Sequence, residues 1–149
     1  MQAHKGRLIV PVGYMGASGR TIVPDVKSFR AHPSALFEIR QFVRDRSAAA
    51  ALSEHITNDL LLAVSEAAAN SIIHTTTADI ELRWSVDGDC FAIEVRDRGI
   101  FKKRVRMAEV EGEGGHGIPL MMALVDQVTI EEGTQSRPGT MVRLVKCLT

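Results

Sequence analysis

In the first half of the chain, hydrophobic residues are spaced as on the buried face of a helix. The first set recurs three and four positions apart and consists of Leu36, Ile39, Phe42 and Val43. This pattern predicts a helix that begins at Ser34, the expected N-cap, and fades in the alanine run 48–51. A second helix is expected from Ser53, its N-cap, to about His74, where three consecutive threonines disfavour further helix because they are β-branched.

From residue 80 onward the period of the pattern changes from helical spacing to strict alternation. Residues 80–86 and 91–95 alternate between apolar and polar side chains, which predicts two half-buried strands joined by a turn at 87–89. Residues 100 to about 115 have no period and are rich in charge and glycine, so we expect a long, lid-like loop there. The remaining elements that the pattern predicts are a helix at 118–125 and strands at 127–130 and 140–147.

The predicted order is helix, helix, hairpin, long loop, helix, hairpin, and this order favours an α+β fold. Helices gathered on one face of a mostly antiparallel sheet form a two-layer α/β sandwich. Residues 1–24 contain short β-branched runs interrupted by glycine and proline. We therefore expect residues 1–24 to be an N-terminal extension, flexible or forming an edge strand, ahead of one domain at 25–149.

Composition and charge exclude several classes of partner. The chain has 149 residues and a formal net charge of zero, so general attraction to nucleic acid or to an anionic membrane is not indicated. It has neither an apolar run long enough to span a bilayer nor a convincing secretory leader, and we expect a cytoplasmic protein. Cys90 and Cys147 lie in apolar, strand-like runs, and we expect buried free thiols because two cysteines make no disulfide framework.

Three polar residues of the second predicted helix, Glu66, Asn70 and His74, are each four positions apart and therefore share one face. Leu62 and Ile73 border Glu66, so we expect the polar groups to point into a pocket, where a buried carboxylate needs a partner or a ligand. Glu66 and Asn70 could supply a general base and a metal-binding amide oxygen. A polar pair that bonds to a neighbouring loop explains them equally well, and His74 is interpreted as a structural residue.

Glycines mark two further candidate sites. The segment 112–117 contains G-x-G-x-x-G, but no βαβ unit surrounds it, so a dinucleotide-binding fingerprint is rejected. Glycine N–H groups ahead of a helix can still approach an anion closely, although a surface loop would look the same. Asp97 ends a predicted strand and is followed by Gly99. The carboxylate there could accept from an exocyclic amine and the glycine could leave room for a flat ring, or the two could form an Asx turn.

Taken in order, four short segments resemble the successive boxes of the Bergerat-fold (GHKL) ATPases. They are E-A-A-A-N-S-I-I-H at 66–74, D-R-G at 97–99, G-G-H-G-I-P-L-M at 114–121 and G-T at 139–140. Within that superfamily the chain is similar to the small anti-sigma-factor serine/threonine kinases, of which L-A-V-S-E-A-A-A-N and G-I-P-L-M-M-A-L-V-D are typical. The resemblance covers about residues 29–145.

The resemblance implies a role for each matching residue. Asn70 would coordinate a Mg²⁺ that bridges the ATP phosphates, and Glu66 would be the base for the attacking hydroxyl. Asp97 would accept from the adenine amino group, with Gly99 beneath the ring and Thr140 adding a hydrogen bond. The lid residues that would close on the phosphates are Gly115, His116 and Gly117.

The function implied by the resemblance is that of an anti-sigma factor and protein kinase. Such a protein binds ATP–Mg²⁺, sequesters a sigma factor and phosphorylates a serine or threonine of an anti-anti-sigma (STAS-domain) partner, usually as a homodimer. One departure matters, because Phe101 stands where the family commonly has the second glycine of D-x-G-x-G. It motivates an alternative, a catalytically weak or inactive module of the same fold that acts only by sequestration. A sensor histidine kinase is disfavoured, since His74 lies inside the Asn70 box.

Overall fold

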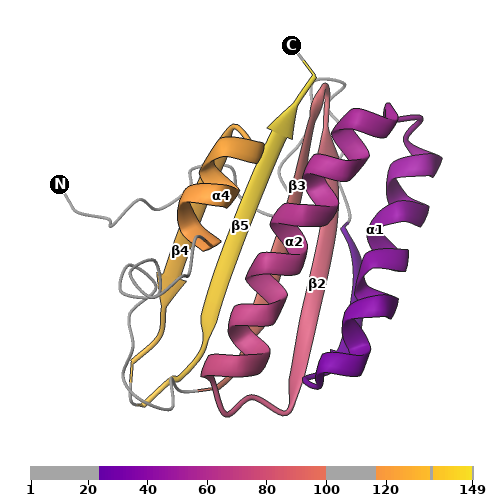
Figure 1. Cartoon of the computed structure of the whole chain (residues 1–149). Coiled ribbons are helices and arrows are strands. Elements are labelled where there is room, and N and C mark those ends of the chain that lie inside the picture. The colour runs from indigo at the N-terminus through magenta and orange to yellow at the C-terminus, as the bar shows by residue number, and fades with distance from the viewer. Residues whose placement is uncertain (1–23, 100–116, 135, 149) are drawn as a thin grey trace, which may run out of the picture.

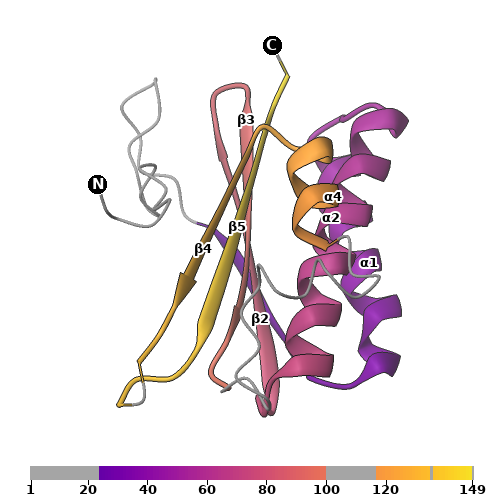
Figure 2. The ribbon, with the colours of Figure 1, turned by 60° about the vertical axis from the view of Figure 1, so that its left-hand side comes forward.

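The computed structural model describes residues 24–99, 117–134 and 136–148. The elements in chain order are β1 (Asp25–Arg30), the 3-10 helix η1 (Pro33–Ala35), α1 (Leu36–Ala49), α2 (Glu54–His74), β2 (Asp79–Asp87), β3 (Cys90–Asp97), α4 (Gly117–Leu124), β4 (Gln127–Glu132) and β5 (Thr140–Cys147). The strands form a five-stranded antiparallel sheet in the order β1-β2-β3-β5-β4. The three α-helices lie on one face of it, as Figure 2 shows nearly edge-on. The predicted α+β two-layer sandwich is confirmed.

Alternation along the central strands separates the two faces of the sheet. On β2, the side chains of Ile80, Leu82 and Trp84 are buried under the helices, while the intervening polar side chains are half-exposed on the other face. β2 and β3 pair from Ile80 opposite Asp97 to the turn, where Gly88 takes a φ of +62° that favours glycine. The strands that the alternation predicted are therefore confirmed, and the end of β3 at Asp97 lies beside the start of β2.

Helix α2 is the central helix of the covering layer, with α1 on one side and α4 on the other (Figure 1). The side of α2 that is buried in the core includes Ala63, Ala67 and Ala68, all fully buried. Alanine side chains are short, so the backbone of α2 can lie close to its neighbours. This close packing fixes the distance between the polar side chains of α2 and the sheet.

One of the two predicted helix N-caps is confirmed, and the other is wrong. Ser53 is the N-cap of α2, as predicted, and its hydroxyl accepts from the N–H of Ile56. The prediction that Ser34 caps the first helix is wrong. His32 accepts from the N–H of Ser34 instead, and a 3-10 turn precedes α1, which has no side-chain cap. Among the described helices, none has the length and hydropathy that crossing a bilayer requires.

Strand β1 at the edge of the sheet was not predicted as an element. Of its six residues only Phe29 is buried, so the strand has no hydrophobic alternation that a sequence pattern could reveal. It is ordered by backbone pairing with β2, from Asp25 opposite Trp84 to Arg30 opposite Asp79. The predicted extension at 1–24 and the predicted loop at 100–115 lie almost wholly outside the described residues.

The expectation of free thiols is wrong, because Cys90 and Cys147 form a disulfide with an S–S distance of 2.05 Å. The two residues are opposite each other in the register of β3 and β5, which brings their Cβ atoms together. They are 57 residues apart in sequence, and nothing in the sequence marks this register. The bridge lies at the end of the strand pair farthest from Asp97 and Thr140.

Removing the disulfide is expected to lower the free energy of unfolding. The double variant Cys90→Ser, Cys147→Ser frees a loop of this length in the unfolded chain, which corresponds to a loss of up to about 4 kcal/mol. Urea unfolding of the oxidised protein and the double variant measures the difference. Reduced wild-type protein should resemble the variant, and equal stability of oxidised and reduced protein would contradict the expected contribution.

Candidate functional site

The candidate polar residues of α2 have different surroundings. Asn70 is only 7% exposed, and its Nδ2 finds no hydrogen-bond partner among the residues that the structure describes. Buried amide groups are nearly always paired, so among the described residues this donor is a candidate for binding a ligand. Glu66, one turn earlier, is half-buried. His74 is the last residue of α2 and is also half-buried.

The expectation that Leu62 and Ile73 frame a pocket around Glu66 is wrong. Their side chains are 52% and 58% exposed, so they lie on the outer surface of α2 rather than in a wall. The reason is the position of α2 between α1 and α4, which leaves the helix face opposite the sheet open. Asn70 is turned from this open face toward the interior, and Glu66 lies at the boundary between them.

Asp97, the last residue of β3, is a buried carboxylate with its own hydrogen bonds. Its side chain is 6% exposed, and it lies opposite Thr140, the equally buried first residue of β5. Oδ2 accepts from the hydroxyl of Ser71 at 2.6 Å, and Oδ1 accepts from the N–H of Gly99 at 3.1 Å. Burial raises the pKa of Asp97, and the hydrogen bonds from Ser71, Gly99 and the backbone of Thr140 only partly oppose it. A further donor from a ligand would therefore stabilise the charged form.

Gly99 lies against the loop that follows α2. A Cβ atom at this position would overlap the backbone nitrogen of Thr77 and lie 2.9 Å from Oγ1 of Thr75. Only glycine allows this approach, which packs the end of β3 against the end of α2. Glycine is also required at Gly139, which has a φ of +143°, because a Cβ added there would lie 2.6 Å from the carbonyl oxygen of Asp97. The room for a flat ring above Gly99 stays a prediction.

Of the three predicted lid residues, Gly115 and His116 lie outside the described residues and Gly117 begins α4. Lys146 donates to the carbonyl of Leu124 at the other end of α4, near the disulfide end of β5. The N-terminal end of α4 therefore points toward the end of the sheet that holds Asp97 and Thr140. Backbone N–H groups at a helix N-terminus favour an anion.

The available oxygen ligands limit what kind of metal could bind. Within the described ranges, no group of three or more His, Cys, Asp or Glu side chains could hold a metal ion. The amide oxygen of Asn70 is a hard ligand, suited to Mg²⁺, which commonly takes one or two protein ligands and completes its shell with substrate phosphates and water. The donor set thus fits a magnesium ion brought with a polyphosphate.

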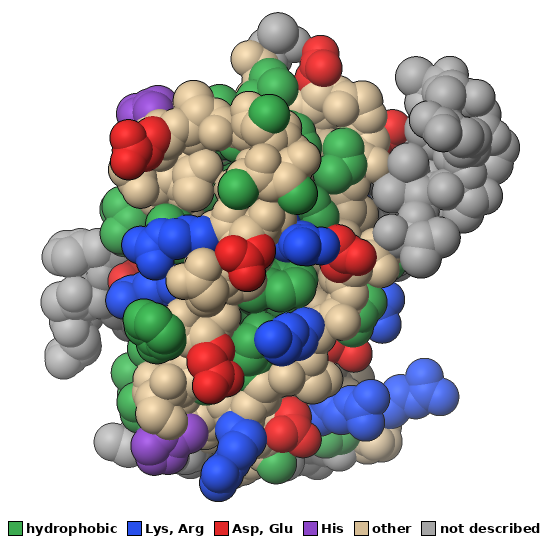
Figure 3. All heavy atoms as spheres, turned by 90° about the vertical axis from the view of Figure 1, so that its right-hand side faces the viewer, with side chains coloured by type: hydrophobic (Ala, Val, Ile, Leu, Met, Phe, Trp, Pro, Cys, Tyr) green, Lys and Arg blue, Asp and Glu red, His purple; other side chains and the backbone are tan. Residues whose placement is uncertain are grey.

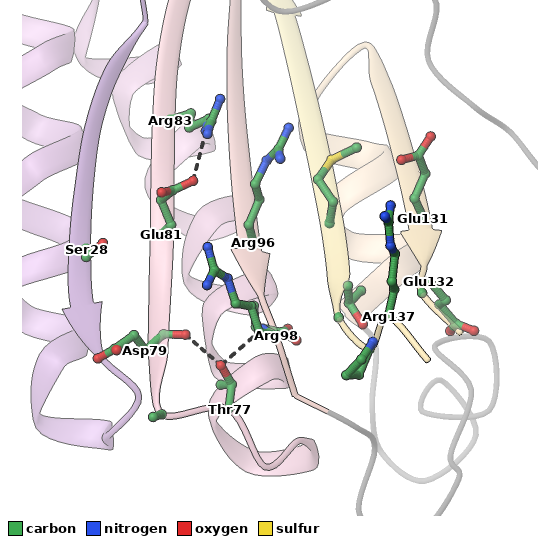
Figure 4. Close-up of a pocket in the computed structure, with 17 residues that line it drawn as sticks. Ser28, Thr77, Asp79, Glu81, Arg83, Arg96, Arg98, Glu131, Glu132 and Arg137 are labelled. Carbon is green, nitrogen blue, oxygen red and sulfur yellow. Dashed lines mark hydrogen bonds and ion pairs between the residues drawn. The ribbon is translucent and has the colours of Figure 1, made fainter. Parts of the chain in front are cut away.

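A hollow of about 560 Å³ lies on the opposite, helix-free face of the sheet (Figure 4). Basic and acidic side chains alternate along it, and Arg83 donates to Glu81 at 2.9 Å. Next to it the buried Glu94 accepts from Arg96 at 2.8 Å and from Arg143 at 2.7 Å. Several of these charges are thus paired with one another. Asp97 and Thr140 also line the hollow, whereas Glu66 and Asn70 do not, and the side chain of Asp97 bonds to Ser71 of α2. We therefore place the candidate site on the helix side of Asp97.

Charges are also mixed on the outside of the helical layer. Figure 3 shows basic and acidic side chains interspersed on the face that includes α1, with no broad area of one sign. On α1 itself Arg40, Arg44 and Arg46 alternate with Glu38 and Asp45. An interface that relies on a strong field of one sign, such as a nucleic-acid groove, needs a different distribution.

The sequence did not single out Ser71, the residue that bonds to Asp97. A serine on the buried side of an apolar helix is a signal, but its partner is 26 residues away and the sequence does not reveal the pairing. The structure thus brings together Asn70, Ser71, Asp97, Gly99 and Thr140, around the end of α2 and the adjoining ends of β3 and β5.

Residues 29–146 match the family of histidine kinase-like ATPase domains. The fold is also similar to the crystal structure of the RsbU and RsbW domains of Rv1364c from Mycobacterium tuberculosis, with a TM-score of 0.66 and 22% identity over 86% of this chain. The chain spans 33% of that longer protein, and at this identity the likeness concerns the fold alone. No match was found among curated proteins.

The buried carboxylate predicts a specific pH dependence of stability. The pKa of Asp97 is raised in the folded protein, so the unfolded chain loses this proton first, and stability falls as pH rises from the ordinary value of 3.8 through the raised one. The variant Asp97→Asn lacks this step. Urea unfolding of both proteins across pH should show the wild type losing stability relative to the variant in that window; a constant difference would contradict the raised pKa.

Proposed function

Because the chain belongs to the histidine kinase-like ATPase domain family, we propose that it binds ATP with Mg²⁺ between α2, the end of β3 and the start of α4. The observation that carries this proposal is the buried side chain of Asn70, whose Nδ2 is unpaired among the described residues, next along α2 to Ser71, which bonds to the Asp97 carboxylate. Asn70 would supply one oxygen ligand to the metal, which neutralises phosphate charge when bound. Asp97 would accept from the adenine amino group, beside Gly99 and Thr140.

The remaining roles in this proposal concern the phosphates. Phosphoryl transfer needs positioning and charge neutralisation more than covalent chemistry by the protein. Glu66 would take the proton of the attacking substrate hydroxyl while the hydroxyl oxygen bonds to the γ-phosphorus. The bond between the γ-phosphorus and the bridging β-phosphate oxygen would break, with ADP as leaving group. Its half-buried position at the edge of the open face of α2 suits a hydroxyl that arrives from outside. Gly115, His116 and Gly117 would close on the phosphates.

The biological role that we propose is that of an anti-sigma factor and serine/threonine kinase. It would sequester a sigma factor, phosphorylate a STAS-domain partner and act in the cytoplasm as a homodimer. The resemblance of the sequence boxes supports this role, as does the fold likeness to a structure whose title names an RsbW domain. The Cys90–Cys147 disulfide is unusual for a reducing compartment, where we expect the pair to be reduced.

A binding module without catalysis is the second candidate. Phe101, in place of a glycine that the family commonly has, favours it because phenylalanine lacks the backbone freedom of glycine. In that case the fold and the sequestration of a partner would remain, and phosphotransfer would be slow or absent.

Replacing Asn70 by alanine is expected to remove Mg²⁺-dependent nucleotide binding and leave the fold intact. The side-chain Nδ2 makes no hydrogen bond within the described residues, so its loss leaves no new unpaired group, whereas a metal ligand disappears. Calorimetry should find ATP–Mg²⁺ binding weakened by about 100-fold or more. Asn58→Ala, on an exposed position of the same helix, is the matched control. Unchanged affinity in Asn70→Ala would refute the metal-ligand role.

The variant Glu66→Gln is expected to bind ATP normally and to lose phosphotransfer, because the amide cannot take the proton. The assay uses radiolabelled ATP and a panel of STAS-domain proteins, with Glu38→Gln on exposed α1 as control. Transfer by Glu66→Gln at the wild-type rate would exclude Glu66 as the base. If wild-type protein binds ATP but labels no member of the panel, the binding module becomes the better description.

A further inference from the structure

We propose that Ser71 is a positioning residue that sets the choice of nucleobase, because its hydroxyl fixes the Asp97 carboxylate and itself presents only an acceptor to the ligand. The inference rests on the proposed nucleotide site and adds a determinant of its specificity. It starts from the bond between Ser71 Oγ and Asp97 Oδ2, which joins α2 to the end of β3.

The two oxygens of Asp97 are held by donors from different segments. Ser71 donates to Oδ2 at 2.6 Å, and the N–H of Gly99 donates to Oδ1 at 3.1 Å. The backbone of Thr140 also bonds to this carboxylate, so donors from three segments hold its plane. Of the three, Ser71 is the one that donates through a side chain, and it is the donor from the helical layer. The bond from Ser71 also lowers the pKa of Asp97 against the larger effect of burial, and so favours the ionised acceptor.

Ser71 is itself held in place. It is 4% exposed, and its carbonyl oxygen accepts from Oγ1 of Thr75 at 2.6 Å. The same Oγ1 accepts from the N–H of Thr77 at 3.2 Å, in the loop that packs against Gly99. The serine therefore belongs to a small rigid network at the end of α2.

The hydrogen-bond donors that Ser71 and Asp97 have available determine which nucleobase they can bind. A serine hydroxyl has one proton, and in Ser71 this proton is engaged on Asp97, so Oγ can only accept from a ligand. Asp97 in its ionised form also only accepts. A base with a 6-amino group satisfies such a pair, whereas a 6-oxo group places oxygen against oxygen with no proton between them.

The metal end of the site should not depend on this bond. Asn70 and Ser71 are neighbours on α2, and their side chains leave the helix about 100° apart. Loss of the Ser71 hydroxyl should therefore reduce the preference for adenine without changing the dependence of binding on Mg²⁺.

The experiment is calorimetry of the full chain with ADP and with inosine diphosphate, each with Mg²⁺. Wild-type protein is expected to prefer ADP by about 100-fold. Ser71→Ala should bind ADP about tenfold more weakly and inosine diphosphate unchanged, and Ser71→Thr, which keeps the hydroxyl, should restore the preference. The control is Ser65→Ala, a buried serine of the same helix whose oxygen accepts from Arg40.

An unchanged ratio of ADP to inosine diphosphate affinity in Ser71→Ala would overturn the inference. If both affinities are also unchanged, Ser71 has no role in binding, and if both fall equally, its role is structural only. If Ser71→Ala does not fold, Ser71→Cys, with its weak donor, takes its place and should show a partial loss of preference. Failure of wild-type protein to bind either nucleotide would instead refute the nucleotide site itself.

Discussion

The hydrogen bond between Ser71 and Asp97 ties the two layers of this fold together at one point. It joins the last turn of α2 to the last residue of β3, where β3 is also paired with the first residue of β5. Gly99 completes the junction, since its missing side chain lets the loop after α2 approach the backbone directly. The junction therefore joins α2, the end of β3 and the loop between α2 and β2 at one place.

Burial gives the junction its chemistry. A carboxylate that is taken out of water, with a raised pKa, is an acceptor that gains from one more donor. The side-chain Nδ2 of Asn70, one residue before Ser71, is likewise buried and has no hydrogen-bond partner among the described residues. Asp97 also lines the charged hollow on the other face of the sheet, but its side chain bonds to Ser71 of α2, and in the hollow Arg83 is already paired with Glu81. A ligand with an amine at one end could donate to Asp97, and a metal-bound polyphosphate at its other end could bind the side-chain amide of Asn70.

The sequence could predict those features of the fold and the candidate site that produce a periodic or local sequence pattern. Alternation of apolar and polar residues predicted β2 and β3, and the Ser53 cap marked the start of α2. Strand β1 left no such trace because pairing, not burial, orders it. The exposure of Leu62 and Ile73 depends on which neighbours flank α2, and that is tertiary information.

Long-range pairs were the other limit. Cys90 and Cys147 are 57 positions apart and meet through the register of β3 and β5. Ser71 and Asp97 are 26 positions apart and meet through the packing of α2 on the sheet. The candidate residues Asn70, Asp97 and Thr140 were predicted because their short motifs occur in a recognisable order. Ser71, adjacent to Asn70, shows what such motifs omit, since its importance comes from its partner.

The central claim, a nucleotide site at the junction of α2 with the ends of β3 and β5, can be tested by NMR. A titration of isotope-labelled protein with ADP and Mg²⁺ follows the side-chain amide of Asn70 and the backbone amides of Ser71, Gly99 and Thr140 together. These signals are expected to shift with a common dissociation constant, while the amides of Cys90 and Cys147, at the far end of the same strands, stay in place. Saturable binding that leaves the four junction signals unmoved, or no binding at all, would contradict the account.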